Sequence, residues 1–219
     1  MCLTCLVDAV SSPEHRDGRR QAGAQTRQRL LDAATEILAR NGESGLTLRA
    51  VSAVAGSNVA TVKYHFGSRE GLVDEVITNA TQSVIGAQIA ALDALHDQQP
   101  SVEALIRAWA TPLVRVAVSR EKSDRRLGRI ISQSHASPKG RLDRTFKDAT
   151  AVPTQRLQAA LRQALPHLDT AELTLRVALM LSALAGFTSG AFDAFIAESD
   201  PERGLQDRVV NRLVAIMTA

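Results

Sequence analysis

The sequence predicts an all-α protein, and three observations support that class. Leucine and alanine dominate the chain of 219 residues, in which aromatic residues make up only 3%. Apolar residues recur at helical spacing through most of the chain. The few glycines and prolines fall between these periodic stretches, where they mark turns rather than interrupt helices. A chain of this length can form one large core, or a small domain followed by a larger one.

Four helices in the first part of the chain have recognisable starting residues. Ser, Thr and Asn accept hydrogen bonds from the free N–H groups of a first helical turn. The N-caps expected on this basis are Thr26, Thr47, Asn58 and Ser68. The first helix should end at Asn41-Gly42, and the fourth should run towards Leu95. A fifth helix is expected over residues 102–118, after Pro100.

The second half of the chain predicts the remaining helices of a total of nine to ten. They are expected over residues 125–134, over 142–165 with a kink near Pro153, from Asp169 or Thr170 to about Ala197, and from Pro201 to about Met217. Polar loops and prolines separate these stretches. All of them are apolar enough on one face to pack against one another.

The layout of a helix-turn-helix unit, two short helices joined by a sharp turn, is found in residues 47–72. Gly56 lies at the turn, where a residue without Cβ takes a positive φ at low cost. The second of these helices carries Thr61, Lys63, Tyr64 and His65. A short helix rich in hydrogen-bond donors and aromatic rings suits the major groove of DNA.

The same segment resembles the N-terminal domain of the TetR/AcrR family of transcriptional regulators over residues 26–77. The matching landmarks are Asn41-Gly42, Thr47-Leu48-Arg49, Ala55-Gly56, Thr61-Val62, Tyr64-His65-Phe66, Ser68-Arg69-Glu70 and Leu72. Three positions depart from the commonest pattern of that family: Ser57, Lys63 and Arg69. We interpret these departures as features of one branch.

The resemblance implies which residues contact DNA. It places Thr61, Tyr64, His65 and Arg69 on the DNA backbone, and Asn58, Val59, Ala60 and Lys63 at base edges or flanking phosphates. Thr47, at the start of the preceding helix, completes the DNA-binding candidates. The alternative for Tyr64 and His65 is ordinary packing within a small domain.

The chain divides into three expected regions: a flexible N-terminal arm over residues 1–25, a DNA-binding domain over 26–72, and a helical ligand-binding and dimerisation domain over 73–219. One helix-turn-helix reads few base pairs, so a homodimer on a palindromic operator is expected. The candidate dimer interface is Leu173, Val177, Leu181, Leu184, Gly186, Gly190, Leu205, Val209 and Leu213. Burial within one monomer is the alternative for each of these residues.

A ligand pocket is expected among the middle helices of the C-terminal domain. Its candidate lining residues are Ile85, Trp109, Leu113, Ile130, Phe146 and Leu157, with ordinary core packing as the alternative. The C-terminal half also resembles the branch of the family that responds to fatty acids or acyl-CoA. Residues 115–147 hold ten basic and three acidic residues, a net charge of +7. This basic stretch is expected either to meet an anionic headgroup or to form a solvated helix face.

Other classes of protein lack their signatures here. We find no glycine-rich phosphate loop, nucleophile elbow or paired metal motif, so an enzyme is not expected, nor is a cofactor or metal. Cys2 and Cys5 form a C-x-x-C that lacks two further ligands. No run of about 18 uninterrupted apolar residues predicts a membrane span. The expectation is therefore a cytoplasmic, ligand-released repressor, with a helical enzyme or a ligand-independent DNA-binding protein as alternatives.

Overall fold

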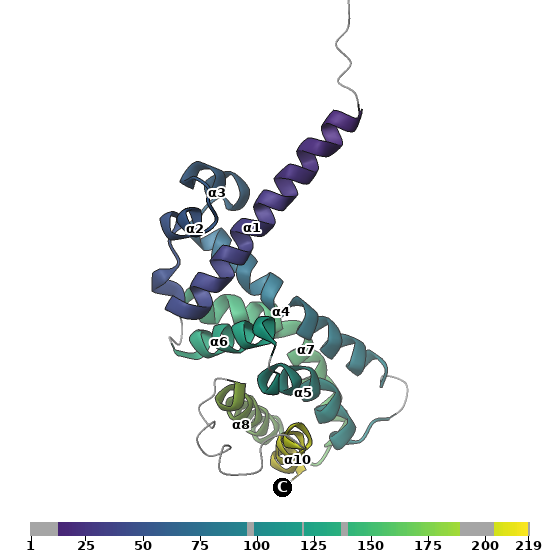
Figure 1. Ribbon diagram of the computed structural model, residues 1–219. Coiled ribbons are helices and arrows are strands. Elements are labelled where there is room, and N and C mark those ends of the chain that lie inside the picture. Colours follow the sequence, from purple (N-terminus) through teal and green to yellow (C-terminus); the bar gives the residue numbers. More distant parts are fainter. Residues whose placement is uncertain (1–12, 96–98, 120, 137–139, 189–203, 219) are drawn as a thin grey trace, which may run out of the picture.

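The computed structural model describes residues 13–95, 99–119, 121–136, 140–188 and 204–218. Every regular element within these ranges is an α-helix, which confirms the predicted fold class. The helices are α1 (Pro13–Gly45), α2 (Leu48–Val54), α3 (Val59–Phe66), α4 (Arg69–Asp93), α5 (Val102–Val118), α6 (Lys122–Ala136), α7 (Arg141–Ala164), α8 (Thr170–Thr188) and α10 (Leu205–Thr218). Figure 1 shows α1, α2 and α3 at one end and α8 and α10 at the other, with α4 running between the two ends.

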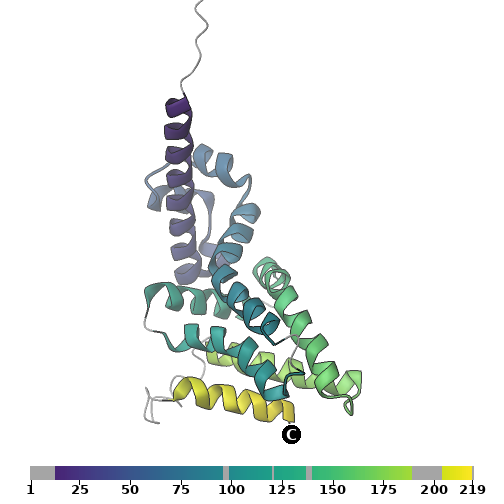
Figure 2. The same ribbon diagram turned by 90° about the vertical axis from the view of Figure 1, so that its right-hand side faces the viewer.

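The start of α1 corrects the expected domain organisation. Residues 13–25 were expected to lie in a flexible arm, but they belong to α1, whose first turns project from the body of the molecule (Figures 1 and 2). Thr26 is therefore no N-cap, and its hydroxyl instead donates to the Ala22 carbonyl oxygen at 2.9 Å. Pro13 suits a first helical turn, and the Arg, Gln and Ala residues that follow favour helix. Residues 1–12, with Cys2 and Cys5, lie outside the described residues.

The other predicted starts in the N-terminal domain are confirmed. Thr47 accepts a hydrogen bond from the Ala50 N–H group at 3.1 Å, and Ser68 accepts one from Gly71 at 3.1 Å. The break predicted at Gly42 is also present, as a non-helical residue with φ 68° inside α1. Each of these features depends on residues that are close in sequence, which explains why the sequence predicts them well.

A continuous apolar core joins the N-terminal domain to the C-terminal domain. Leu38 of α1, Val62 of α3 and Leu72 of α4 are fully buried in one cluster. The same cluster contains Ile130 of α6 and Leu142 of α7, although both helices belong to the C-terminal domain. The two domains therefore share one apolar core. A shift of α6 or α7 would displace side chains of that core, in which the N-terminal helices also pack.

A second core holds the C-terminal domain together. It is built mainly from α5, α7, α8 and α10, with Trp109, Leu157, Val177 and Leu213 all nearly or fully buried. By length and composition alone, α8 is apolar enough to cross a membrane, with a mean hydropathy of 1.4. Core helices pass the same test, and α8 packs against α5, α6 and α10. The predicted continuation of this helix to Ala197 lies outside the described residues.

Candidate functional site

The recognition helix α3 is held in place at both ends. Asn58 caps its start, where its Oδ1 accepts hydrogen bonds from the Thr61 N–H group at 2.8 Å and from the Thr61 hydroxyl at 3.1 Å. Gly56, with φ 61°, and Gly67, with φ 72°, form the turns on either side. Val62 is fully buried beneath the helix. The outer face of α3 is thus presented on a well-anchored support.

The outer face of α3 carries most of the predicted DNA contacts. Tyr64 is 83% exposed, although it has a large aromatic side chain. Its ring packs edge-on against the His65 ring, with 5.1 Å between the ring centroids. Among the predicted contacts, the exposed residues are Thr47, Asn58, Ala60, Lys63 and Tyr64, and the half-buried ones are Val59, Thr61 and His65. The exposed tyrosine and lysine side chains do not help to form the core. Both can donate hydrogen bonds to DNA.

Arg69 differs from the role that the family resemblance implied. Its Nε donates to the Leu46 carbonyl oxygen at 2.7 Å, and its Nη2 donates to the Glu43 carbonyl oxygen. A third nitrogen lies 3.6 Å from the Glu43 carboxylate. These contacts give Arg69 a structural role, in which it fixes the start of α4 against the end of α1, and its phosphate contact stays a prediction. Sequence patterns do not reveal these partners, which lie 23 and 26 residues from Arg69 along the chain.

Arg27 is a second structural arginine that the sequence did not reveal. Its guanidinium lies 5.1 Å from the centre of the Phe66 ring, and it forms an ion pair with Glu75 at 2.7 Å. A cation over an aromatic face is attracted by the ring's quadrupole. Arg27 therefore links α1 to the end of α3 and to α4.

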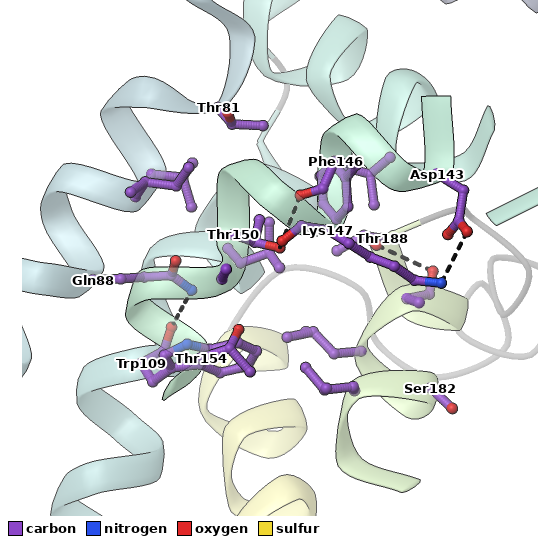
Figure 3. A pocket seen from close by; sticks show the side chains of 18 of the residues that line it. Thr81, Gln88, Trp109, Asp143, Phe146, Lys147, Thr150, Thr154, Ser182 and Thr188 are labelled. Carbon is purple, nitrogen blue, oxygen red and sulfur yellow. Dashed lines mark hydrogen bonds and ion pairs between the residues drawn. The ribbon is translucent and has the colours of Figure 1, made fainter. Parts of the chain in front are cut away.

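A cavity of about 490 Å³ lies among α4, α5, α6, α7 and α8. Figure 3 shows polar and apolar side chains from these helices arranged around it. Four of the predicted lining residues border it, namely Ile85, Trp109, Leu113 and Phe146. The predictions for Ile130 and Leu157 are wrong, because these side chains are fully buried in the two cores. Ile131, one position along α6, lines the cavity instead.

Several residues predicted for a dimer interface are buried within the chain instead. Leu173, Val177 and Leu213 belong to the C-terminal core. Leu181 and Leu184 line the cavity, and Gly190 lies outside the described residues. Helical periodicity identifies an apolar face but not the neighbour that covers it, which explains these corrections. Leu205, Val209 and Gly186 are half-buried, so the structure leaves them partly accessible.

Apolar surface remains open on α8 at Leu175 and Leu179, beside the mouth residues Ala178 and Ser182 that border the cavity. Leu175 and Leu179 are 55% and 53% exposed and lie one turn apart. Ala171, Ala178 and Ser182 are exposed on the same helix. Small residues beside exposed leucines leave room for another helix to approach closely.

Comparisons with known proteins agree with this architecture. Residues 107–219 match the family described as "Tetracyclin repressor-like, C-terminal domain", and residues 30–76 match "Bacterial regulatory proteins, tetR family". The chain belongs to the TetR family of transcriptional regulators. TetR-family regulators are not enzymes, so membership confirms the expectation against an enzyme.

Individual relatives of this TetR-family protein are distant. An uncharacterized HTH-type transcriptional regulator in the dhlA 5′ region of Xanthobacter autotrophicus is 34% identical over 82 residues. That match spans 36% of this chain and 41% of the relative. A transcriptional regulator from Pseudomonas aeruginosa PAO1 has a similar fold, with a TM-score of 0.64 at 18% identity, covering 94% of this chain and 95% of the other.

A third similar structure is that of the regulator FadR from Bacillus subtilis in complex with stearoyl-CoA. Its TM-score is 0.64 at 13% identity, over 86% of this chain and 97% of the other. At such identities the two solved structures support the TetR fold of this chain and nothing more.

Polar contacts connect the two domains of this TetR-family protein beside the cavity. Arg126 of α6 forms an ion pair with Glu36 of α1. Burial raises the pKa of the Glu36 carboxyl, but the positive charges of Arg126 and Arg40 outweigh it, and the pKa lies below its usual value of 4.5. A depressed carboxyl pKa means that this pair stabilises the folded protein at neutral pH and that the contribution is lost in acid.

The start of α7 is tied to α4 and to the end of α1 as well. Asp74 of α4 forms an ion pair with Arg141 and accepts a hydrogen bond from the Thr145 hydroxyl at 2.8 Å. The Glu43 carboxylate accepts a hydrogen bond from the Leu142 N–H group at 3.2 Å, at the first turn of α7. Arg126 and Arg141, which form these ion pairs, belong to the basic stretch of residues 115–147. That stretch was expected either to meet an anionic headgroup or to form a solvated helix face.

Proposed function

We propose that this TetR-family protein is a cytoplasmic, homodimeric repressor that binds a palindromic operator and is released by an effector. The observation that carries the proposal is the arrangement of α3. Asn58 caps its start, its inner face is buried at Val62, and Lys63 and Tyr64 are exposed on its outer face. In this account Lys63 and Asn58 face base edges or flanking phosphates, and Tyr64 and His65 donate to the DNA backbone. Thr47, Val59, Ala60 and Thr61 complete the contact surface.

A second copy of the chain is the proposed partner of the open face of α8. Leu175 and Leu179 would pack across a two-fold axis, with Val209 of the neighbouring α10 at the edge. A two-fold axis there lies at the opposite end of the molecule from α3 (Figure 1). The interface would therefore join the two subunits at one end and leave both copies of α3 free at the other. Their separation then sets the spacing of the half-sites.

The effector is proposed to occupy the cavity among α4–α8. Its volume is within the range of small-molecule sites, and most of its wall is apolar. FadR, which shares the fold, binds stearoyl-CoA. We therefore propose a lipid-like effector, a fatty acid or an acyl-CoA, whose acyl chain lies in the cavity.

The effect of effector binding would be transmitted to α3 through α6 and α7 as well as through α4. On α6, Ile131 lines the cavity while Ile130 packs in the N-terminal core. On α7, Asp143 lines the cavity while the neighbouring Leu142 packs in that same core. A ligand that displaces either helix must move side chains beneath the recognition helix, because packed cores transmit shifts.

The operator proposal is tested by selecting bound sites from random duplex DNA with the purified protein. We expect enrichment of an inverted repeat whose half-site centres are about 10 base pairs, or a multiple of that, apart. Enrichment of no sequence, or of a single unpaired half-site, would contradict a dimeric repressor.

Asp74→Asn tests the proposed coupling. This change keeps the side-chain volume and the acceptor for Thr145 but removes the ion pair with Arg141. We expect operator affinity without effector to stay close to wild type. The loss of affinity caused by stearate or stearoyl-CoA should shrink by about fivefold or more, since allosteric couplings amount to roughly 1–3 kcal/mol. Fluorescence anisotropy with labelled operator measures both quantities.

Asp148→Asn is the matched control for this prediction, because Asp148 is an exposed acid of α7, the helix that carries Arg141 and Thr145. It should respond to effector as wild type does. An equal response in Asp74→Asn and wild type would show that the α4–α7 contact plays no part in release.

A further inference from the structure

The charges around the cavity cancel one another. Among the described lining residues only Asp143 and Lys147 carry charge, and the Lys147 ammonium group donates to the Asp143 carboxylate at 2.8 Å (Figure 3). The Asp143 side chain is 8% exposed, and the ion pair with Lys147 helps to offset the cost of burying its charge. A ligand carboxylate in the cavity could pair with Lys147 only by breaking the ion pair that Lys147 forms with the buried Asp143 carboxylate. The wall therefore favours an uncharged ligand.

Four of the five hydroxyl groups that line the cavity, those of Thr81, Thr150, Ser182 and Thr188, already donate hydrogen bonds within their own helices, and Thr154 is the fifth. Thr81 donates to the Ile77 carbonyl oxygen at 2.8 Å, and Thr150 donates to that of Phe146 at 2.9 Å. Ser182 and Thr188 likewise donate to carbonyl oxygens of their own helix, α8. These four groups can still accept hydrogen bonds, but they offer a ligand no free donor.

Trp109 carries a buried donor that has no partner. The residue is 3% exposed and lines the cavity, yet its indole Nε1 has no hydrogen-bond partner. Its backbone is fixed, because the Gln88 side chain donates to the Trp109 carbonyl oxygen at 2.9 Å. Among the described lining residues, no other buried side-chain nitrogen or oxygen lacks a partner. Leaving a buried donor unpaired is unfavourable, and a ligand acceptor would relieve that cost.

We infer that the cavity selects an uncharged, mainly apolar effector that carries a hydrogen-bond acceptor, and that the Trp109 indole N–H group is the donor that recognises it. The acceptor is a carbonyl oxygen or its equivalent, as in a ketone, an ester or a thioester. The inference rests on the proposed effector site and narrows the lipid-like class. Of its two members it favours a thioester carbonyl over a free carboxylate.

Three probes of similar size separate these possibilities: butyrophenone has a neutral acceptor, butylbenzene has none, and 4-butylbenzoate is an anion. Isothermal titration calorimetry with the full chain measures their affinities for wild type and for Trp109→Phe. This substitution keeps an aromatic ring and removes the N–H group. We expect wild type to bind butyrophenone about tenfold more tightly than butylbenzene, as a paired buried donor suggests. In Trp109→Phe the preference should fall to about twofold or less.

The anionic probe tests the charge argument separately. We expect 4-butylbenzoate to bind wild type more weakly than butyrophenone. Tightest binding of the anion, an undiminished ketone preference in Trp109→Phe, or no binding of any probe would overturn the inference. If Trp109→Phe fails to fold, replacement of the indole by benzothiophene, which has sulfur in place of the N–H group, gives the same comparison. Operator selection uses the protein without effector, so failure here is distinguishable from failure of the repressor proposal.

Discussion

Lys63→Ala is expected to weaken operator binding by roughly 30-fold or more while leaving the protein folded and dimeric. Lys63 is exposed on α3, so its side chain contributes little to the core. If it contacts a base edge, its loss costs about 1–3 kcal/mol per recognition helix, and the dimer loses the contact twice. The combined effect is roughly 30-fold to more than 10⁴-fold in affinity. Tyr64→Ala should behave in the same way, because Tyr64 is 83% exposed. Fluorescence anisotropy on the selected operator measures the loss.

Arg162→Ala is the matched control, because it removes an exposed cation from the far end of α7. It should bind operator within about twofold of wild type, since it changes net charge equally but lies in the C-terminal domain. Wild-type binding by both Lys63→Ala and Tyr64→Ala would remove α3 from the DNA interface.

Leu179→Arg is expected to convert the dimer to a monomer and thereby to abolish operator binding. Leu179 is 53% exposed in the single chain, so the arginine can be solvated and the fold should persist. Full burial of a leucine side chain contributes roughly 1.5–3 kcal/mol, and a two-fold interface contains the residue twice. Burying two arginines near the axis adds repulsion. Together these effects weaken dimerisation by at least about 100-fold. Sedimentation velocity measures the change in mass.

Val152→Arg provides the comparison, because Val152 is an exposed apolar residue of α7, away from the proposed interface. It should remain dimeric and bind operator normally. If Leu179→Arg sediments as wild type does, α8 is not the dimer interface and the exposed leucines require another partner.

The local features of this fold could be predicted from the sequence. Thr47, Asn58 and Ser68 cap their helices as expected, because a cap involves residues within one turn. The bounds of α5 agree with the predicted range of 102–118 for the same reason.

The features that failed all depend on contacts between distant segments. Ile130 and Ile131 are adjacent on α6, and only the packing of α1 and α7 decides which of them faces the cavity. The structural role of Arg69 could not be predicted, because its partners Leu46 and Glu43 lie 23 and 26 residues away along the chain. Leu181 was assigned to a dimer interface, since an apolar stripe on α8 has the same appearance whether a cavity or a second chain covers it.

The salt dependence of binding to the selected operator, with a shuffled duplex of equal length beside it, tests the central claim most directly. A DNA-reading dimer should bind the operator at least about 10³-fold more tightly than the shuffled duplex, with an affinity for both that falls steeply as salt rises. Equal affinity for the two duplexes, or affinity that is insensitive to salt, would contradict the account of α3 as a sequence-specific reader of DNA.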